Sequence, residues 1–345
     1  MEKQRLTGSE TDIEKRLVRL NLGIFPERVV RLAGDASTRS YFRAHYHGGE
    51  TRVLMLLANP GQNEEAPFLD VQRFLENLGL PVPRVYAHHA SEGLIELEDL
   101  GDELLETVVE QADEKQVREL YVQAVDLLVR MRWAVHGSDS TCGAFALAFD
   151  QSKLLQEMDF FVTHFIRGLA GIEPSPAESE ALVDFFTMIC SRLAGEPRIF
   201  THRDYHARNL ILHNGSLVMI DFQDARMGPA QYDLASLLRD SYVTLPEDFV
   251  QELIARYLEG VGEKGADSQE LFHYIFDLMS LQRNIKALGT FGYQVHLKRA
   301  ARYVSSIPRT AAYVGRNINR YPEFGRFRPV VEDLITGPAS LITAS

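Results

Sequence analysis

Thr201-His202-Arg203-Asp204-Tyr205-His206-Ala207-Arg208-Asn209 decides the fold, and Leu217-Val218-Met219-Ile220-Asp221-Phe222 follows it a few residues later. The two stretches place Asp204, Asn209 and Asp221 in an ordered set of two carboxylates and one amide. Asp204 can orient and deprotonate an acceptor hydroxyl, while Asn209 and Asp221 offer the oxygen ligands that Mg²⁺ prefers. Phosphoryl transfer needs such a set, because its difficulty lies in positioning and in neutralising charge. The pattern therefore predicts phosphoryl transfer from ATP with Mg²⁺.

The residues between these groups predict a strand, a polar loop and a hairpin. Residues 197–200 indicate a short strand that enters the loop. Asn214-Gly215 separates two apolar runs, 210–212 and 217–220, and this is a hairpin signal. Asn209 and Asp221 are then expected on neighbouring strands or at strand ends, as ligands of a shared ion must be. An ordinary aspartate in a turn, or a histidine packed in the core such as His202, would account for one residue of this stretch. It would not account for Asp204, Asn209 and Asp221 occurring in this order.

Length and composition describe an ordinary globular protein. The 345 residues suggest about two domains, at roughly 150 residues for each. With 45% apolar and 24% charged residues and no long uncharged apolar run, we expect no membrane span. The charged start 1–5 gives no export signal, so we expect a cytoplasmic protein with reduced Cys142 and Cys190. The net charge of −12 argues against nucleic acid as a partner, and no protein partner is inferred.

The order of the predicted elements indicates an α+β fold of two lobes. Residues 1–100 predict a small β-rich, nucleotide-binding lobe with one helix near 68–78 and strands at 29–32, 40–46 and 51–57. Gly48-Gly49 marks a hairpin turn between the last two strands. Residues 101–345 predict a larger helical lobe for catalysis and substrate binding, with helices at 117–132, 153–168 and 178–195.

Phrases along most of the chain resemble the aminoglycoside phosphotransferase family, the small-molecule branch of the protein-kinase-like fold. They are His202-Arg203-Asp204, Asn209, Ile220-Asp221 and Tyr232-Asp233-Leu234-Ala235. Within that family the chain is similar to the bacterial anomeric kinases that phosphorylate N-acetylmuramate and N-acetylglucosamine at C1, in cell-wall sugar recycling. The supporting phrases include Gly34-Asp35-Ala36-Ser37, Leu237-Leu238-Arg239-Asp240 and 281–289. The resemblance implies a bilobal protein-kinase-like fold and ATP-dependent transfer to a sugar hydroxyl.

The resemblance also implies where the nucleotide binds. The loop over the ATP phosphates would contain Gly34, Ala36, Ser37 and Thr38. Glu96 and Leu97 would belong to the hinge, where backbone groups pair with adenine.

One strand departs from the family pattern. Met55 stands near the position where a kinase usually carries the lysine that pairs with the α- and β-phosphates. We expect Arg43 to supply the missing positive charge, because an arginine fork suits phosphate oxygens. Arg39 and Arg52 stay open as alternatives. A second interpretation of the missing lysine is a non-catalytic ATP-binding regulatory protein. Asp204, Asn209 and Asp221 argue against this interpretation, because a binding protein has no need of a base beside two metal ligands.

Basic residues near the C-terminus indicate an anionic acceptor rather than a polycationic one. Between Arg283 and Tyr321 the chain has eight Lys or Arg and no Asp or Glu. Such a local field would suit a sugar acid such as N-acetylmuramate. The residues expected to contact the acceptor are Gln282, Arg283 and Lys286, with His206 and Arg208 from the loop. Another small alcohol, such as an aminoglycoside or a choline-like molecule, stays open as the acceptor.

Overall fold

The chain divides into two compact units in the computed structural model. The structure describes residues 13, 15–17, 25–32, 39–58, 65–138 and 141–342. The N-terminal unit consists of residues 1–103 together with 211–223, and the C-terminal unit consists of 104–210 together with 224–345. Segment 211–223 therefore packs with the N-terminal unit although it lies far beyond residue 100 in the sequence.

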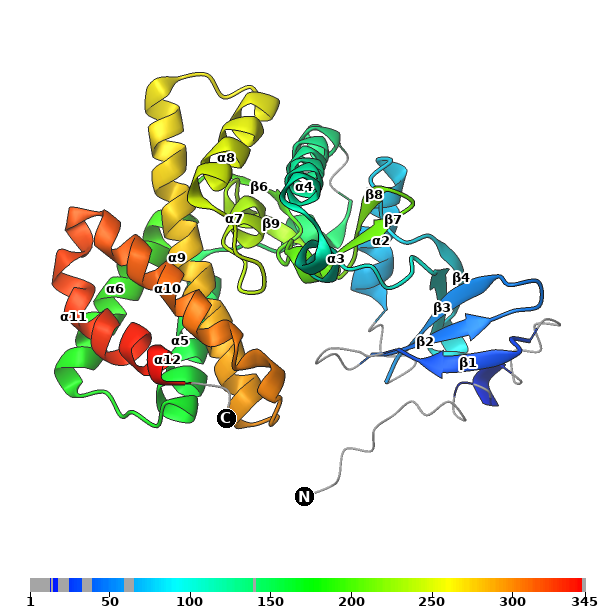
Figure 1. The fold of residues 1–345 in the computed structure, drawn as a ribbon, viewed down its shortest axis with the longest axis horizontal. Coiled ribbons are helices and arrows are strands. Elements are labelled where there is room, and N and C mark those ends of the chain that lie inside the picture. Colours follow the sequence, from blue (N-terminus) through cyan, green and yellow to red (C-terminus); the bar gives the residue numbers. More distant parts are fainter. Residues whose placement is uncertain are drawn as a thin grey trace. The chain divides into compact units, whose positions relative to one another are not determined.

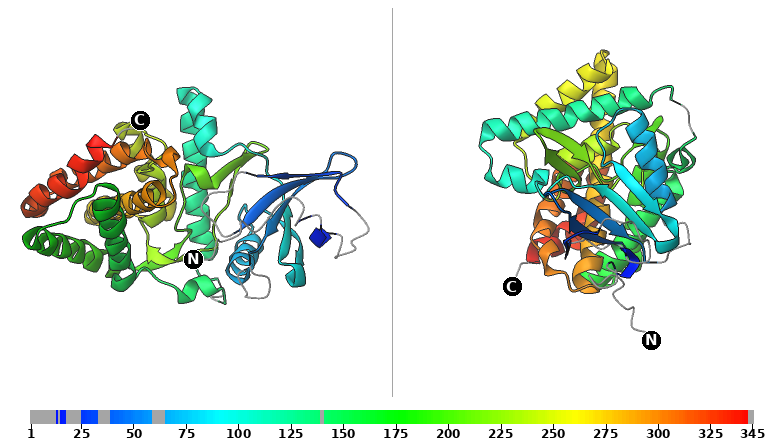
Figure 2. Two further views of the ribbon diagram at one scale, coloured as in Figure 1. Left: turned by 90° about the horizontal axis from the view of Figure 1, so that it is seen from below. Right: turned by 90° about the vertical axis from the view of Figure 1, so that its right-hand side faces the viewer.

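The N-terminal unit is built on a five-stranded antiparallel sheet (Figures 1 and 2). The strands, in their order across the sheet, are β1 (Arg28–Arg31), β2 (Ser40–His45), β3 (Thr51–Leu56), β5 (Leu94–Glu98) and β4 (Val85–His89). The predicted turn between β2 and β3 is confirmed, and both Gly48 and Gly49 have φ of 87°. Glycine is favoured there because a side chain would be strained at positive φ.

The two faces of this sheet differ in chemistry. Phe42 and Ala44 of β2 pack on a buried apolar cluster with Leu54 and Leu56 of β3. Tyr41 pairs directly with Met55, so these two side chains share the opposite face. Met55 is fully buried there, as a core residue would be.

A helix and a late hairpin complete the N-terminal unit. Helix α2 (Ala66–Asn77) buries Phe68, Leu69, Val71 and Leu75. The ring of Phe68 stacks on that of Phe222, with centroids 5.2 Å apart. The hairpin of β7 (Leu210–His213) and β8 (Ser216–Met219) turns at Asn214-Gly215, as predicted, with φ of 50° and 77°.

The C-terminal unit is mainly helical, which confirms the predicted α+β class. Its described helices are α3 (Leu105–Gln111), α4 (Glu114–Val135), α5 (Gln151–Phe161), α6 (Pro176–Ala194), α7 (Tyr232–Leu238), α8 (Glu247–Val261), α9 (Ala266–His296), α10 (Ser306–Arg320), α11 (Arg328–Val331) and α12 (Gly337–Leu341). A short antiparallel pair, β6 (Arg198–Thr201) and β9 (Arg226–Pro229), lies among them. Within the described part of the chain, no helix is long and apolar enough to cross a membrane.

Local sequence explains where several helices begin. Asp113 and Ser175 each form a capping box with the side chain three residues later, at the starts of α4 and α6. These side chains satisfy backbone N–H groups that the first turn of a helix leaves without partners. The predicted helix at 153–168 differs in one respect, because α5 ends at Phe161 and a π-helical segment, Val162–Leu169, follows it.

Helix α9 is the long central element of the C-terminal unit, and α5, α10 and Val162–Leu169 pack against it (Figure 1). Two glycines permit this close packing. A Cβ atom on Gly289 would lie 2.7 Å from the Cα of Phe161, and one on Gly292 would lie 2.5 Å from the carbonyl oxygen of His164. The approach of the two backbones fixes α9 beside α5, and with it the residues one turn earlier.

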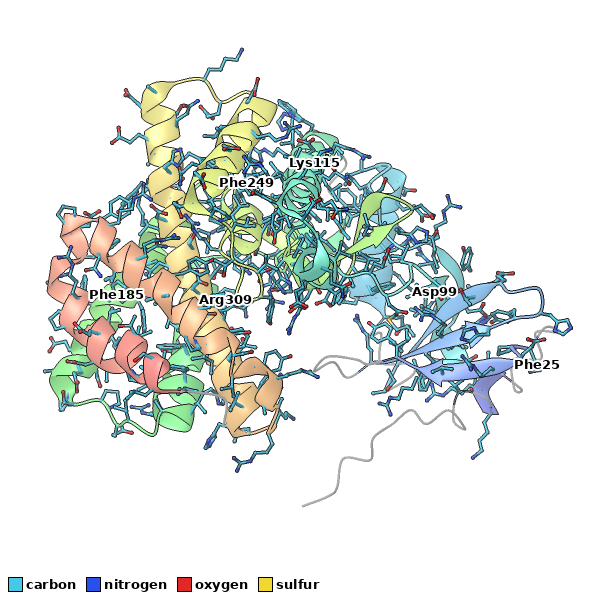
Figure 3. All side chains as sticks on the ribbon, viewed as in Figure 1. Phe25, Asp99, Lys115, Phe185, Phe249 and Arg309 are labelled. Atoms are coloured by element: carbon cyan, nitrogen blue, oxygen red, sulfur yellow. The ribbon has the colours of Figure 1, made fainter. Side chains whose placement is uncertain are left out.

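A cluster of phenylalanine rings closes the far side of these helices. Phe185 of α6, labelled in Figure 3, packs against Phe186, Phe324 and Phe327 with ring centroids 5.1 to 6.2 Å apart. All four rings are buried. The rings form an apolar contact between α6 and residues 322–327.

Candidate active site

The loop after β6 is held by a buried carboxylate from the start of α7. The two oxygens of Asp233 accept hydrogen bonds from the backbone N–H groups of His202 at 2.6 Å and Arg203 at 2.9 Å. Burial raises the pKa of Asp233 to about 7, although the two N–H donors work in the opposite direction. Arg203 has φ of 81°, so the chain turns sharply just before Asp204. Asp233 thus braces the turn that presents Asp204.

Asp204 lies among positive charges. Its Oδ1 is 3.2 Å from Nζ of Lys286, and its Oδ2 is 3.8 Å from Nε of Arg203. Burial alone would raise the pKa of Asp204, but the charges of Lys286, Arg203 and Arg283 hold it well below its usual range. The side chain is 21% exposed. Asp204 is therefore an ionised carboxylate that solvent, or an acceptor, can still reach.

A second buried carboxylate holds the other end of the loop. Asp240 accepts hydrogen bonds from the backbone N–H groups of Ala207 and Tyr242, each at 2.9 Å. Burial raises the pKa of Asp240 to about 6, against the effect of these two donors. The ring of His206 stands edge-on to that of Tyr242, with centroids 5.5 Å apart. Burial lowers the pKa of His206 to about 3, so its imidazole is neutral near pH 7.

Asn209 and Asp221 have donor chemistry that fits a hard cation. The side-chain amide of Asn209 donates to the backbone oxygen of Asp204 at 2.9 Å, which fixes the amide plane. Asp221 has φ of 63°, and its Oδ1 accepts a hydrogen bond from Gln223 at 2.7 Å. One amide oxygen and one carboxylate, together with phosphate oxygens, are a set that Mg²⁺ accepts. The two residues belong to different units.

The C-terminal unit contains an open pocket beside Asp204. Its volume is about 110 Å³. Four of the predicted residues line it, namely Asp204, His206, Arg283 and Lys286. The other lining residues are Ser236, Arg239, Asp240, Ser241, Tyr242, Asn284, Ala287, Thr290 and Phe291. The pocket is thus polar and rich in cations near the carboxylate, with apolar side chains of α9 on one wall.

Two predicted acceptor residues lie elsewhere in the C-terminal unit. Gln282 is fully buried, and its amide donates to Glu157 at 3.0 Å. Arg208 forms an ion pair with Glu106 at 2.7 Å, and its guanidinium lies 3.6 Å from the centroid of the Tyr242 ring. Neither side chain is among those that line the pocket. Contact of either residue with an acceptor stays a prediction.

The basic run after α9 is largely engaged in protein contacts. Arg316 pairs with Glu247 at 2.6 Å, and Arg320 pairs with Asp277 at 2.9 Å. Arg309 on α10, labelled in Figure 3, donates to the backbone oxygen of Tyr242. These charges therefore hold helices and a loop together. Of the cations beside Asp204, Arg283 and Lys286 come from the earlier part of the run, on α9, and Arg203 comes from the loop itself.

The nucleotide residues predicted in the N-terminal unit have mixed surroundings. Gly34, Ala36, Ser37 and Thr38 lie outside the described residues. Glu96 is buried; its carboxylate forms an ion pair with Arg52 at 2.9 Å and lies 3.0 Å from Nε2 of His89. Leu97 is buried and pairs with Val53 across the sheet.

Arg43 is held by two carboxylates. Its guanidinium donates to Asp99 at 2.7 and 3.0 Å and to Asp102 at 2.7 and 2.9 Å. The side chain of Asp99 is 6% exposed, whereas that of Asp102 is 74% exposed. The contact with Asp102 can exchange with other oxygens, and the role of Arg43 in ATP binding stays a prediction.

The sequence did not reveal the roles of Asp240, Tyr242 and Glu106. Asp240 occurs in a family-like phrase, but nothing in its spacing to Ala207 indicates a hydrogen bond across 33 residues. Tyr242 and Glu106 meet the loop only through tertiary packing around Arg208. The sequence offered one signal, which is that Asp240 directly follows the apolar residues of 232–238. An aspartate buried at such a position requires hydrogen-bond partners.

The two units and the braced Asp204 loop define a kinase-like phosphotransferase. The chain belongs to the phosphotransferase enzyme family, whose model matches residues 28–268. It is 30% identical over 319 residues to the N-acetylmuramate/N-acetylglucosamine kinase of Neisseria meningitidis serogroup B, with 90% of this chain and 93% of that protein covered. It is 31% identical over 319 residues to the protein of the same name from Pseudomonas aeruginosa, with 90% of each covered.

Solved structures confirm the predicted protein-kinase-like fold. The ADP-bound aminoglycoside phosphotransferase APH(2'')-Ib matches with a TM-score of 0.60 at 18% identity, covering 87% of this chain and 96% of that one. A choline/ethanolamine kinase family protein from Mesorhizobium loti also matches with a TM-score of 0.60, at 15% identity, covering 94% and 98%. At such identities the likeness concerns the fold alone.

Proposed function

We propose that this protein is an ATP-dependent kinase that phosphorylates the anomeric hydroxyl of N-acetylmuramate or N-acetylglucosamine. The observation that carries the proposal is the ionised Asp204 at the wall of a pocket, with Lys286 3.2 Å away and Arg283 and His206 beside it. The names of the two relatives at 30% and 31% identity support this choice of acceptor.

The electrostatics of Asp204 favour an acidic hydroxyl as the acceptor. A carboxylate with a lowered pKa is a weak base, so it takes a proton most readily from the more acidic hydroxyls. The anomeric hydroxyl of a sugar is more acidic than its other hydroxyls. In the proposed reaction Asp204 accepts a hydrogen bond from this hydroxyl, orients its oxygen toward the γ-phosphorus and receives its proton as the bond forms.

The remaining groups have supporting roles in the proposed mechanism. Asn209 and Asp221 would hold Mg²⁺, which when bound neutralises charge on the phosphate oxygens. Asp233 and Asp240 fix the loop at both ends, so that Asp204 needs little reorganisation. The neutral His206 can exchange a hydrogen bond with a sugar oxygen without adding charge.

The charge of the pocket argues against polycationic acceptors. Arg283, Lys286 and Arg239 are among its lining residues, and an aminoglycoside would bring further ammonium groups to them. Like charges at short range are unfavourable in a partly buried site. We therefore propose a neutral or anionic sugar. We also propose that the protein acts in the cytoplasm.

The test is turnover of each N-acetyl sugar compared with its 1-O-methyl glycoside, followed by phosphorus NMR. The methyl group blocks C1 and leaves every other hydroxyl in place. We expect a sugar 1-phosphate from the free sugars and no product from the glycosides. Equal phosphorylation of a glycoside would exclude anomeric transfer, and turnover confined to aminoglycosides or choline would exclude the sugar.

A further inference from the structure

We propose that Lys286 is a catalytic residue whose ammonium group contacts both Asp204 and the transferring phosphoryl group. This inference rests on the proposed kinase activity. It differs from the expectation that the cations of α9 serve to bind an acidic group on the acceptor.

The position of Lys286 is the first argument. It lies on α9, lines the pocket, and its Nζ is 3.2 Å from Oδ1 of Asp204. An ammonium group has three N–H donors. Across the described residues, Asp204 Oδ1 is the one hydrogen-bond acceptor recorded for Nζ, and the side chain is 18% exposed. Two donors are therefore available to oxygens that enter the pocket.

The two arginines nearest to Asp204, Arg283 and Arg203, are also bound to other groups of the protein. Arg283 donates to the backbone oxygen of Arg203 at 2.8 Å, and its guanidinium stacks 4.7 Å from the centroid of the Tyr232 ring. Arg203 forms an ion pair with Asp224. Both arginines therefore hold the loop in shape. Lys286 is the cation that faces the catalytic oxygen directly.

The redistribution of negative charge during phosphoryl transfer explains why a cation at the position of Lys286 would be catalytic. The acceptor oxygen forms a bond to the γ-phosphorus, while the bond from that phosphorus to the bridging oxygen breaks and its electron pair leaves with ADP. The acceptor proton passes to Asp204, which becomes neutral. Negative charge thus disappears from the carboxylate as the sugar phosphate forms beside it. The ammonium group of Lys286, within reach of both Asp204 and the phosphoryl group, has a negatively charged partner throughout the reaction. This interaction stabilises the transition state.

Packing holds Lys286 in this place. Gly289, one turn later on α9, lets the helix approach the backbone of Phe161 to a distance that a Cβ atom would not permit. Glu157 of α5 adds a negative charge near Lys286, in addition to Asp204. Burial lowers the pKa of Lys286, and the charges of Asp204 and Glu157 act in the opposite direction.

The two proposed acceptors separate a catalytic role from an acceptor-binding role. N-acetylmuramate carries a lactyl carboxylate, and N-acetylglucosamine does not. A lysine that binds this carboxylate affects KM for N-acetylmuramate alone. A lysine that contacts the phosphoryl group affects kcat for both sugars equally.

The experiment measures kcat and KM of Lys286→Met with both sugars by ADP release. We expect kcat to fall by about 10²–10³-fold for each sugar, the usual cost of removing one transition-state donor. KM should change much less. Lys286→Arg should recover part of the rate, since it retains the charge. Lys298→Met, which removes an exposed lysine just after α9, is the matched control and should behave as wild type.

Folding and nucleotide binding are checked by thermal unfolding and by Mg²⁺-ATP titration of each variant. If Lys286→Met does not fold, Lys286→Gln and Lys286→Arg provide the same comparison. An undiminished kcat, or a loss limited to KM for N-acetylmuramate, overturns the inference. Wild-type protein that phosphorylates neither sugar overturns the proposed function, and the inference with it.

Discussion

The two units use their cations in opposite ways. In the N-terminal unit, Arg43 meets two carboxylates and Arg52 meets Glu50 and Glu96. In the C-terminal unit, Arg203 and Lys286 both lie close to the carboxylate of Asp204. In the first group each guanidinium lies between two carboxylates, whereas in the second the carboxylate of Asp204 lies between two cations.

The difference distinguishes cations that are satisfied by carboxylates of the protein from cations that can bind a group entering the pocket. A guanidinium between two carboxylates has its N–H donors satisfied within the protein. A carboxylate among several cations leaves net positive charge toward the pocket, where an anionic group can bind.

Asp204→Asn removes the carboxylate on which the pocket is centred. We expect kcat to fall by about 10²–10⁴-fold, because the amide cannot receive the acceptor proton. The affinity for ATP should be retained, and calorimetry checks it. The matched control is Asp102→Asn in the N-terminal unit, which should leave kcat unchanged because the side chain of Asp102 is 74% exposed and contacts Arg43 rather than the pocket. Wild-type turnover by Asp204→Asn would remove the residue from the mechanism.

Asp221→Ala tests the metal role outside the pocket. We expect it to abolish Mg²⁺-dependent nucleotide binding, whereas Asn209→Ala weakens it, because a charged ligand contributes more than an amide. Titration with Mg²⁺ at fixed ATP measures both. Gln223→Ala, which removes the hydrogen bond to Asp221 Oδ1, is the conservative comparison and should have a smaller effect. Equal Mg²⁺-ATP affinity in Asp221→Ala and wild type would contradict the assignment.

Local structure could be predicted from the sequence, whereas contacts between distant residues could not. The strands, the hairpin turns at Gly48-Gly49 and Asn214-Gly215, and the long helices follow from local periodicity and turn chemistry, so they were predictable. Lys286 was predictable as a pocket residue because it lies in a family-like phrase. Its contact with Asp204 crosses 82 residues and depends on tertiary packing.

Charge in the sequence was less informative than charge in the structure. The run from Arg283 to Tyr321 suggested one basic field, yet Arg316 and Arg320 pair with Glu247 and Asp277. Those partners lie 69 and 43 residues away along the chain (316 − 247 and 320 − 277). Local composition cannot reveal such pairs, because helix packing decides which charges meet.

Gly289→Ala tests whether backbone packing positions the cations of the pocket. The added Cβ would lie 2.7 Å from the Cα of Phe161, so α9 must shift. We expect a loss of about 1–3 kcal/mol in the free energy of unfolding, as for other overpacked sites. We also expect a lower kcat, because Lys286 lies one turn away. Thermal unfolding and steady-state kinetics measure the two effects.

Gly315→Ala on α10 is the matched control for this substitution. Its Cβ would lie 3.5 Å from Cγ2 of Thr336, which is an ordinary contact. Alanine in a helix interior is favoured over glycine by about 0.5–1 kcal/mol, so this variant should be at least as stable as wild type. Equal stability of Gly289→Ala and Gly315→Ala would show that the α9 crossing tolerates a side chain.

Arg43→Met gives the smallest expected effect and tests the N-terminal side of the comparison. Arg43 is our proposed cation for the ATP phosphates, and phosphate would replace the exposed Asp102 while Asp99 keeps its contact. We expect KM for ATP to rise by several-fold, roughly the 1 kcal/mol of one net hydrogen bond. Asp102→Asn should leave this KM unchanged or lower it, since it removes a competitor for the same guanidinium. Arg39→Met and Arg52→Met are parallel variants, and an increase in KM confined to either of them would transfer the role. Lower stability of Arg43→Met with an unchanged KM for ATP would assign Arg43 to the sheet alone.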